Sequence, residues 1–223
     1  MRWKRATKPL EVDKIRLNEF DELVLDHFQR LSDVNHINRA GLTLALRRLG
    51  SSPSLIVETG SSAWGTDSSR LFDSYVRRFG GFFYTVDIRE EAQQALASSL
   101  GPSSRTFVSD SIEFLQKLEL PIGFDKIDLL YLDSFDLDTG FPEPAMNHGL
   151  REFEAAEKFL GEGSIVVIDD TPVDPCLLDA RATTYFEERG IVPGKGSLVL
   201  NYVDSKKYKI IYQHYNVVLV KVS

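Results

Sequence analysis

Hydrophobic residues follow two different spacings along the chain. Between residues 20 and 49 they recur every three or four positions, which predicts two amphipathic helices with a break near 33–36. After the turn signal at 50–53, short apolar and β-branched runs alternate with stretches of helical spacing. The predicted strands are residues 55–57, 82–86, 106–108, 127–132 and 165–168, and the predicted helices are residues 68–79, 89–99, 111–118 and 143–160.

The order of these elements predicts a doubly wound α/β fold. The strands are mostly apolar, as in strands buried on both sides, and their alternation with helices favours parallel pairing through right-handed crossovers. Apolar runs at 208–215 and 217–222 lie almost back to back and predict an antiparallel C-terminal hairpin. We therefore expect a mostly parallel seven-stranded sheet in a domain over residues 51–223, preceded by an N-terminal helical extension over residues 1–50.

Composition narrows the class of protein. The chain has 223 residues, 43% hydrophobic and 26% charged, which is usual for a soluble globular protein with its own core. The excess of 33 Asp and Glu over 26 Lys and Arg argues against general binding to nucleic-acid phosphates. The longest apolar runs are strand-sized, so no membrane span is expected. The single cysteine, Cys176, and the lack of an apolar stretch after the basic start indicate a cytoplasmic protein.

A carboxylate follows each predicted parallel strand. The carboxyl ends of such strands border the crevice where open α/β sheets bind ligands. One acidic residue at such a place often only caps the next helix, but the whole series indicates a ligand site. The residues are Glu58, Asp87, Asp110, Asp133, Asp169 and Asp170.

The loop after the first strand, residues 58–67, is rich in small residues and contains Gly60 and Gly65. Glycine lets a ligand approach the backbone closely. The spacing differs from the G-x-G-x-x-G of pyrophosphate-binding loops, which makes a dinucleotide less favoured. Asp87, at the end of the second strand, can accept both hydroxyls of a ribose. A ribose without a pyrophosphate loop suggests an adenosyl compound.

Taken in order, these motifs resemble those of the class I S-adenosylmethionine-dependent methyltransferases, which are Rossmann-like. The first is an apolar strand, an acidic residue and a glycine loop at residues 55–61, and the resemblance covers about residues 52–223. The terminal hairpin is similar to the seventh-strand arrangement of that family. The other matching segments are residues 84–88, 108–111, 128–133 and 163–171.

This resemblance implies S-adenosylmethionine as the cofactor. Gly60 and Ser61 would lie against its methionine part, and Asp87 would bind its ribose. Asp110 and Ser111 would lie near its adenine. A crevice with carboxylates suits the positive sulfonium, and methyl transfer needs mainly in-line positioning of an acceptor. The residues assigned to cofactor binding are Glu58, Gly60, Ser61, Asp87, Asp110, Ser111 and Asp133.

The chain also partly resembles the metal-dependent O-methyltransferases. Asp133 and the pair Asp169 and Asp170 end strands that we expect to be adjacent, and three oxygen donors suit Mg²⁺ or another divalent cation. In that family a metal at similar positions would orient a substrate hydroxyl and lower its pKa. The chain departs from the family at Asp136, where those enzymes place a lysine. The alternative is that Asp133 positions a substrate or loop, while Asp170 caps the turn before Pro172.

We therefore expect an enzyme that transfers a methyl group to an oxygen of a small-molecule or sugar-like acceptor, with or without Mg²⁺. Asp133 and His148 are the candidate catalytic residues, and His148 would act as a general base if it faces the crevice. Residues 1–50 would serve as a lid on the acceptor side. Two alternatives stay open: a non-catalytic binding or interaction module, and another transferase that uses an adenosyl cofactor. A homodimer is compatible with the sequence.

Overall fold

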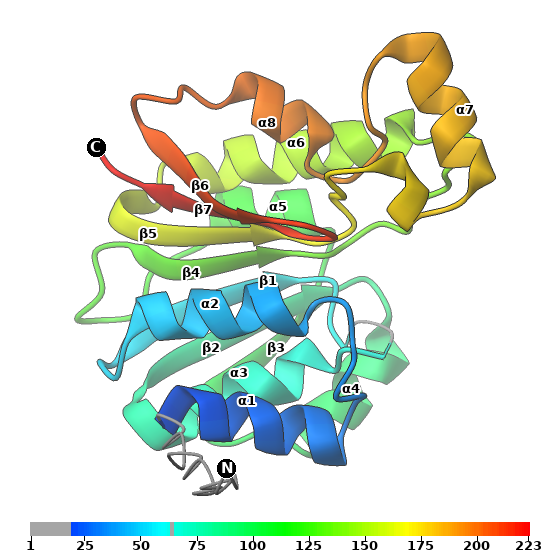
Figure 1. Cartoon of the computed structure of the whole chain (residues 1–223). Coiled ribbons are helices and arrows are strands. Elements are labelled where there is room, and N and C mark those ends of the chain that lie inside the picture. Colours follow the sequence, from blue (N-terminus) through cyan, green and yellow to red (C-terminus); the bar gives the residue numbers. More distant parts are fainter. Residues whose placement is uncertain (1–18, 63–64) are drawn as a thin grey trace, which may run out of the picture.

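Seven strands form one mixed sheet in the computed structural model, which describes residues 19–62 and 65–223 (Figure 1). The order across the sheet is β3-β2-β1-β4-β5-β7-β6. Neighbours from β3 to β5 are parallel, and β7 runs antiparallel to both β5 and β6. The predicted fold class is confirmed. The strands are β1 (Ser54–Thr59), β2 (Gly81–Asp87), β3 (Ser104–Val108), β4 (Ile127–Leu132), β5 (Leu160–Ile168), β6 (Tyr208–Gln213) and β7 (Val217–Lys221).

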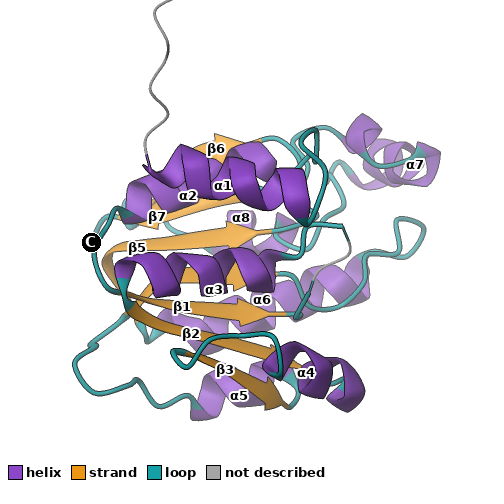
Figure 2. Ribbon diagram, turned by 90° about the horizontal axis from the view of Figure 1, so that it is seen from below, coloured by secondary structure: helices purple, strands orange, loops and turns teal. Residues whose placement is uncertain are grey.

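Helices cover both faces of the sheet (Figures 1 and 2). One face carries α1 (Glu19–Arg30), α2 (Arg39–Leu49) and α3 (Ser68–Phe79), and the other carries α5 (Ser111–Lys117), α6 (Glu143–Glu157) and α8 (Ser197–Tyr202). Beside β3 lies α4 (Glu90–Ala97), whereas α7 (Ala180–Arg189), after a short 3₁₀ turn at Pro175–Leu177, projects from the main body. Among the described helices, none is long and apolar enough to cross a bilayer.

The core has two layers, one on each side of the sheet. Within β1, Ile56 belongs to the core layer that also contains residues of α1, α2 and α3, whereas Leu55 and Val57 belong to the layer beneath α5 and α6. Successive side chains of a strand point to opposite faces, so a strand covered on both sides needs apolar residues at consecutive positions. This arrangement explains the apolar runs without polar alternation.

Three parts of the sequence prediction need correction. The predicted strand at 106–108 is not buried on both sides, because β3 is the edge strand and Val108 is 52% exposed. The helix predicted to reach residue 160 ends at Glu157, and β5 begins at Leu160, where it pairs with Ile127. The region 172–197, for which no element was predicted, contains α7 and the start of α8.

The N-terminal region is packed onto the sheet as far as the structure describes it. Residues 1–18 of the predicted extension lie outside the described residues, whereas α1 and α2 share one core layer with α3. Phe28, Leu42 and Leu46 are fully buried there. The α1–α2 segment therefore contributes directly to the core.

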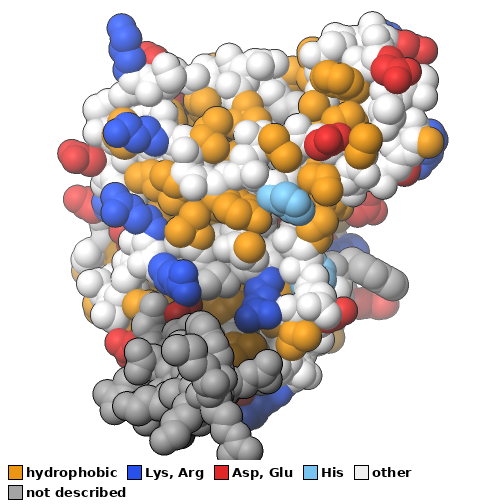
Figure 3. Space-filling model, viewed as in Figure 1, with side chains coloured by type: hydrophobic (Ala, Val, Ile, Leu, Met, Phe, Trp, Pro, Cys, Tyr) orange, Lys and Arg blue, Asp and Glu red, His pale blue; other side chains and the backbone are white. Residues whose placement is uncertain are grey.

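The edge strand β6 exposes apolar side chains. Hydrophobic residues gather over β6 and β7 on the face drawn in Figure 3, and Ile210 and Ile211 are 53% and 38% exposed. A free sheet edge is a place where a second chain can pair. The homodimer stays a prediction, and the β6 edge would suit its interface.

Candidate functional site

The predicted site residues lie at the carboxyl ends of the parallel strands, where the arrowheads point in Figure 2, or in the loops and helix starts that follow them. The backbone there is strained. The described non-glycine residues with positive φ all lie in the loops after β1, β4 and β5, and such strain clusters at functional sites. They are Ser62, Asp67, Phe135 and Asp170.

Glu58, near the end of β1, is enclosed by hydroxyl groups. Its carboxylate accepts hydrogen bonds from Ser68 and Ser69 at 2.5 Å and from Thr85 at 2.6 Å, and the residue is fully buried. Burial raises the pKa of Glu58 from 4.5 to about 7, against the opposing effect of these three hydrogen bonds. Its two oxygens are occupied by these hydroxyl groups, so Glu58 ties the end of β1 to the start of α3; its assignment to cofactor binding stays a prediction.

Gly60 lets two strand-end loops touch. Its φ is +79°, and a Cβ at this position would lie 2.4 Å from the backbone oxygen of Asp133. Its N–H donates to the Val86 carbonyl at 2.9 Å. Glycine is therefore required here both by conformation and by space.

Asp87, at the end of β2, joins the glycine loop to Arg89. It accepts a hydrogen bond from the Ser61 N–H at 3.1 Å, and the Arg89 side chain donates to both of its oxygens, at 2.9 and 2.6 Å. Burial alone would raise the pKa of Asp87, but the hydrogen bonds from Arg89 lower it below its usual value. The Arg89 side chain is 61% exposed, so it can leave without uncovering core.

The predicted adenine-side residues have different surroundings. Asp110 is exposed and caps α5, accepting a hydrogen bond from the Glu113 N–H at 3.0 Å. Ser111 is buried, and its hydroxyl lies 3.0 Å from Nε2 of His148. The capping role weighed for the strand-end acids therefore holds for Asp110.

His148, near the start of α6, belongs to a polar cluster at this edge. Its Nε2 lies 2.9 Å from the Ser134 hydroxyl, which donates to the buried Glu152 at 2.6 Å. The Phe135 ring lies 5.1 Å from the imidazole, centroid to centroid. The side chain of His148 is 15% exposed, so it borders the solvent-accessible edge.

The three aspartates predicted to bind metal do come together, but a lysine lies among them. The Lys195 ammonium is 2.6 Å from Asp133 Oδ1 and 3.0 Å from Asp170 Oδ2. Asp169 accepts hydrogen bonds from the Tyr131 hydroxyl at 2.8 Å and from the Asn38 amide at 2.6 Å. Each carboxylate thus has a donor from the protein.

The charges in this cluster influence one another strongly. Burial, followed by the nearby Asp169, raises the pKa of Asp133 well above its ordinary value. Burial alone would lower the pKa of Lys195, but Asp133, Asp170 and Asp169 outweigh it and raise that pKa. Lys195 is therefore a fixed positive charge, which excludes it as a general base near neutral pH.

The fold around this edge matches known structures, although the sequence does not. No protein-family model and no curated protein matches the chain. A structure of MycE methyltransferase from the mycinamycin biosynthetic pathway, in complex with Mg, SAH and mycinamycin VI, superposes with a TM-score of 0.61 at 17% identity. The match covers 93% of this chain and 55% of the MycE chain. The chain has the class I methyltransferase fold.

Two further structures support this methyltransferase fold. A candidate O-methyltransferase from Klebsiella pneumoniae matches with a TM-score of 0.56 at 15% identity, over 94% of this chain and 93% of its own. A candidate rRNA-methylase from Clostridium thermocellum matches with a TM-score of 0.53 at 16% identity, over 82% and 96%. The resemblance predicted from the motifs is thus confirmed at the level of the fold. The chain spans about half the length of MycE, and the fold alone does not determine the acceptor.

A divalent cation does not fit the aspartate cluster of this methyltransferase fold as it stands. Magnesium takes oxygen ligands at about 2.0–2.1 Å in octahedral geometry. The Lys195 ammonium already occupies the point between Asp133 and Asp170. Within the described ranges, no group of three or more His, Cys, Asp or Glu is arranged to hold a metal. The predicted metal site at Asp133, Asp169 and Asp170 is therefore not supported, because the chain supplies its own cation.

Sequence reasoning missed four residues of this candidate site. Asn38 and Lys195 belong to segments without a strand-end motif. Arg89 directly follows the motif at residues 84–88 but was counted only as the start of a helix, and Tyr131 counted only as an apolar strand residue. One signal was available. The sequence shows Lys195 between Gly194 and Gly196, whereas its burial, which is unusual for a lysine, is seen only in the structure.

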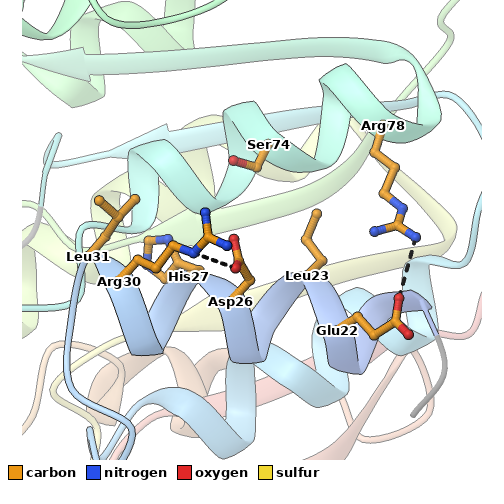
Figure 4. A pocket seen from close by; sticks show the side chains of 8 residues that line it. All are labelled: Glu22, Leu23, Asp26, His27, Arg30, Leu31, Ser74 and Arg78. Atoms are coloured by element: carbon orange, nitrogen blue, oxygen red, sulfur yellow. Dashed lines mark ion pairs between the residues drawn. The ribbon is translucent and has the colours of Figure 1, made fainter. Parts of the chain in front are cut away.

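A separate groove lies on the face that carries α1 and α3. It encloses about 570 Å³, and none of the predicted site residues lines it. Figure 4 shows its polar rim, with ion pairs Arg30–Asp26 and Arg78–Glu22. These exposed pairs leave little unpaired charge, so we assign the groove no ligand.

Proposed function

We propose that this chain transfers the methyl group of S-adenosylmethionine to a hydroxyl oxygen of a small-molecule acceptor. The observation that carries the proposal is the joined unit of Gly60, Ser61 and Asp87 at the ends of β1 and β2 in a class I methyltransferase fold. The MycE structure is a complex with SAH, and the Klebsiella protein bears the name of an O-methyltransferase. Both names support this class of reaction.

The residues at the end of β2 fit an adenosyl compound. Asp87 presents two carboxylate oxygens, and the Arg89 guanidinium now supplies two N–H donors to them. A ribose diol would supply two O–H donors to the same oxygens. Arg89 is largely exposed and can turn into solvent when the ribose binds. Gly60 and Ser61 would then lie beside the methionine part.

The chemistry of the proposed reaction makes few demands on the protein. S-adenosylmethionine supplies an electrophilic methyl group on a sulfonium. The protein must hold the acceptor oxygen in line and take its proton, and His148 is our candidate for the proton acceptor. Asp133 is held by Lys195 and is our candidate for a positioning residue.

The acceptor side of the edge has an apolar component. Phe135 is half exposed and packs next to His148, and Phe141 in the same loop is 64% exposed. Aromatic faces bind flat apolar surfaces, such as an aromatic ring or the carbon face of a sugar. The net charge of −7 disfavours nucleic acid. We therefore propose a hydroxylated small molecule, aromatic or sugar-like, as the acceptor.

Calorimetric titration with S-adenosylmethionine tests the cofactor, and mass spectrometry after incubation with hydroxylated compounds tests the transfer. We expect binding of about micromolar affinity, roughly 8 kcal/mol, and products heavier by one methyl group. His148→Gln should lower kcat by about 10²-fold or more while S-adenosylmethionine still binds.

If the folded protein gives no binding heat on titration with S-adenosylmethionine, the proposal as a whole is contradicted. Tight binding without any methylated product, across phenols, sugars and aliphatic alcohols, would favour the alternative of a binding module.

A further inference from the structure

The aspartate cluster contains a cation that belongs to the chain itself. Lys195 Nζ contacts Asp133 Oδ1 at 2.6 Å, the Asp133 backbone oxygen at 3.2 Å and Asp170 Oδ2 at 3.0 Å. Its side chain is only 6% exposed. A single ammonium thus links the loop after β4 to the loop after β5.

We infer that Lys195 takes the place of a divalent cation at the ends of β4 and β5, so that this chain acts without a metal. That catalysis needs no metal rests on the proposed methyl transfer, whereas the occupation of the site by Lys195 does not depend on it. An ammonium neutralises one charge and donates three hydrogen bonds, which is enough for the three oxygens that it contacts. Asp169 is satisfied separately, by Tyr131 and Asn38.

The backbone around Lys195 is built to deliver this side chain. A Cβ on Gly194 would lie 2.6 Å from the Asp170 carbonyl oxygen, and a Cβ on Gly196 would lie 2.8 Å from the Thr171 hydroxyl. The Lys195 N–H donates to the Asp170 carbonyl at 2.9 Å. Only glycines on both sides allow the segment to run this close to the end of β5.

The other wall of the segment is equally close. A Cβ on Gly149 of α6 would lie 2.3 Å from the Lys195 carbonyl oxygen. The backbone of the segment is therefore held between α6 and the end of β5. The Lys195 side chain is also only 6% exposed, which distinguishes it from a surface lysine that a metal could displace.

A site without a metal would accept a wider range of acceptors. A metal would select compounds with two neighbouring oxygens, because both can bind it. Without a metal, the acceptor hydroxyl must lose its proton to a protein group, and a single hydroxyl is sufficient. We therefore expect monohydroxylated compounds to be methylated as readily as their vicinal diols.

The first experiment titrates the wild-type chain with Mg²⁺ by calorimetry and with Mn²⁺ by electron paramagnetic resonance. We expect no saturable binding of either ion, because Lys195 fills the position. One bound Mn²⁺ per chain that disappears in Asp169→Asn would overturn the inference. This measurement needs no variant of Lys195, so it is decisive even if such variants do not fold.

The second experiment removes the lysine. Lys195→Ala leaves three aspartates around an opened space, and we expect saturable Mn²⁺ binding at a concentration at least about tenfold below the highest at which the wild type shows none, since a repelling charge has gone. The thermal midpoint of this variant should rise with Mg²⁺, and Asp169→Asn in the same background should abolish the rise. Lys126→Ala is the matched control, because it removes a lysine outside the aspartate cluster, whose ammonium donates to the Glu162 carbonyl.

The two proposals fail in different ways. Metal titrations are made without S-adenosylmethionine, so a chain that binds neither metal nor cofactor sinks the proposed function alone. A chain that binds cofactor and loses its methylation activity in EDTA, with recovery on adding Mg²⁺, sinks only the inference about Lys195. Identical Mn²⁺ affinity in Lys195→Ala and wild type would also count against that inference.

Discussion

At the scale of single residues, Glu58 links the pH to the stability of the fold. Its pKa rises from 4.5 to about 7 because the carboxyl group is fully buried. The folded state therefore binds this proton more tightly than the unfolded state does. The associated stability is present below pH 4.5 and is lost as the pH rises through about 7, in total roughly 3 kcal/mol.

Glu58→Gln tests this linkage, because glutamine keeps an oxygen acceptor but does not titrate. We expect the difference in unfolding free energy between pH 5 and pH 7.5 to shrink by roughly 2–3 kcal/mol in the variant, measured by urea denaturation. Glu162→Gln, an exposed residue, controls for the loss of one negative charge. An unchanged pH dependence in Glu58→Gln would show that this group is not the one that titrates.

Asp87 and Arg89 provide a second test at this scale. If Arg89 occupies the ribose position, Arg89→Ala should bind S-adenosylmethionine about two- to fivefold more tightly, since an exposed ion pair contributes about 0.2–1 kcal/mol. Asp87→Ala should weaken binding by about tenfold or more, because hydrogen bonds to a charged group contribute about 1.5–3 kcal/mol. Calorimetry of both variants checks whether the affinity for S-adenosylmethionine rises in Arg89→Ala and falls in Asp87→Ala. Weaker binding by Arg89→Ala would instead make Arg89 a ligand of the cofactor.

At the scale of elements, the contact between the loops after β1 and β4 depends on Gly60. Gly60 and Gly50 have nearly the same φ, +79° and +81°, but a Cβ meets backbone only at Gly60 and nothing within 4 Å at Gly50. Gly50→Ala should therefore lose only the conformational term, roughly 1–3 kcal/mol, and keep cofactor binding. Gly60→Ala should be less stable than Gly50→Ala in urea and should bind S-adenosylmethionine at least about tenfold more weakly. Equal behaviour of the two variants would mean that the loops can separate freely.

The strands could be predicted from the sequence, whereas the contacts between distant loops could not. Burial on both faces makes residues 55–57 of β1, most of β4 and residues 165–168 of β5 apolar, so the pattern along the chain locates these strands and the acidic residues at their ends. Lys195 reaches Asp133 across 62 positions, and Asn38 reaches Asp169 across 131. No local periodicity encodes such contacts, because they depend on the path of the loops. The sequence therefore predicted the three aspartates correctly as a cluster and could not predict the cation among them.

At the scale of the whole molecule, the N-terminal helices are needed to cover one face of the sheet. Val24, Phe28, Leu42 and Leu46 are almost completely buried in the core layer on this face of the sheet, and each such side chain contributes about 1.5–3 kcal/mol. Their sum is comparable to the total stability of a typical domain, about 5–15 kcal/mol. We therefore expect a chain of residues 51–223 to lack a cooperative thermal transition and to aggregate through the uncovered face of the sheet.

Complementation separates a structural requirement from a simple loss of solubility. Residues 1–50 supplied as a separate peptide should restore a cooperative transition, because α1 and α2 bury their apolar faces without needing the covalent link at residues 50–51. The same peptide with Leu42→Asp should fail, since a carboxylate would enter a position that is fully buried. Restored folding should also restore the Asn38 contact to Asp169, which joins α2 to the aspartate cluster. If residues 51–223 alone unfold with the midpoint of the full chain, the helices are a lid rather than part of the core.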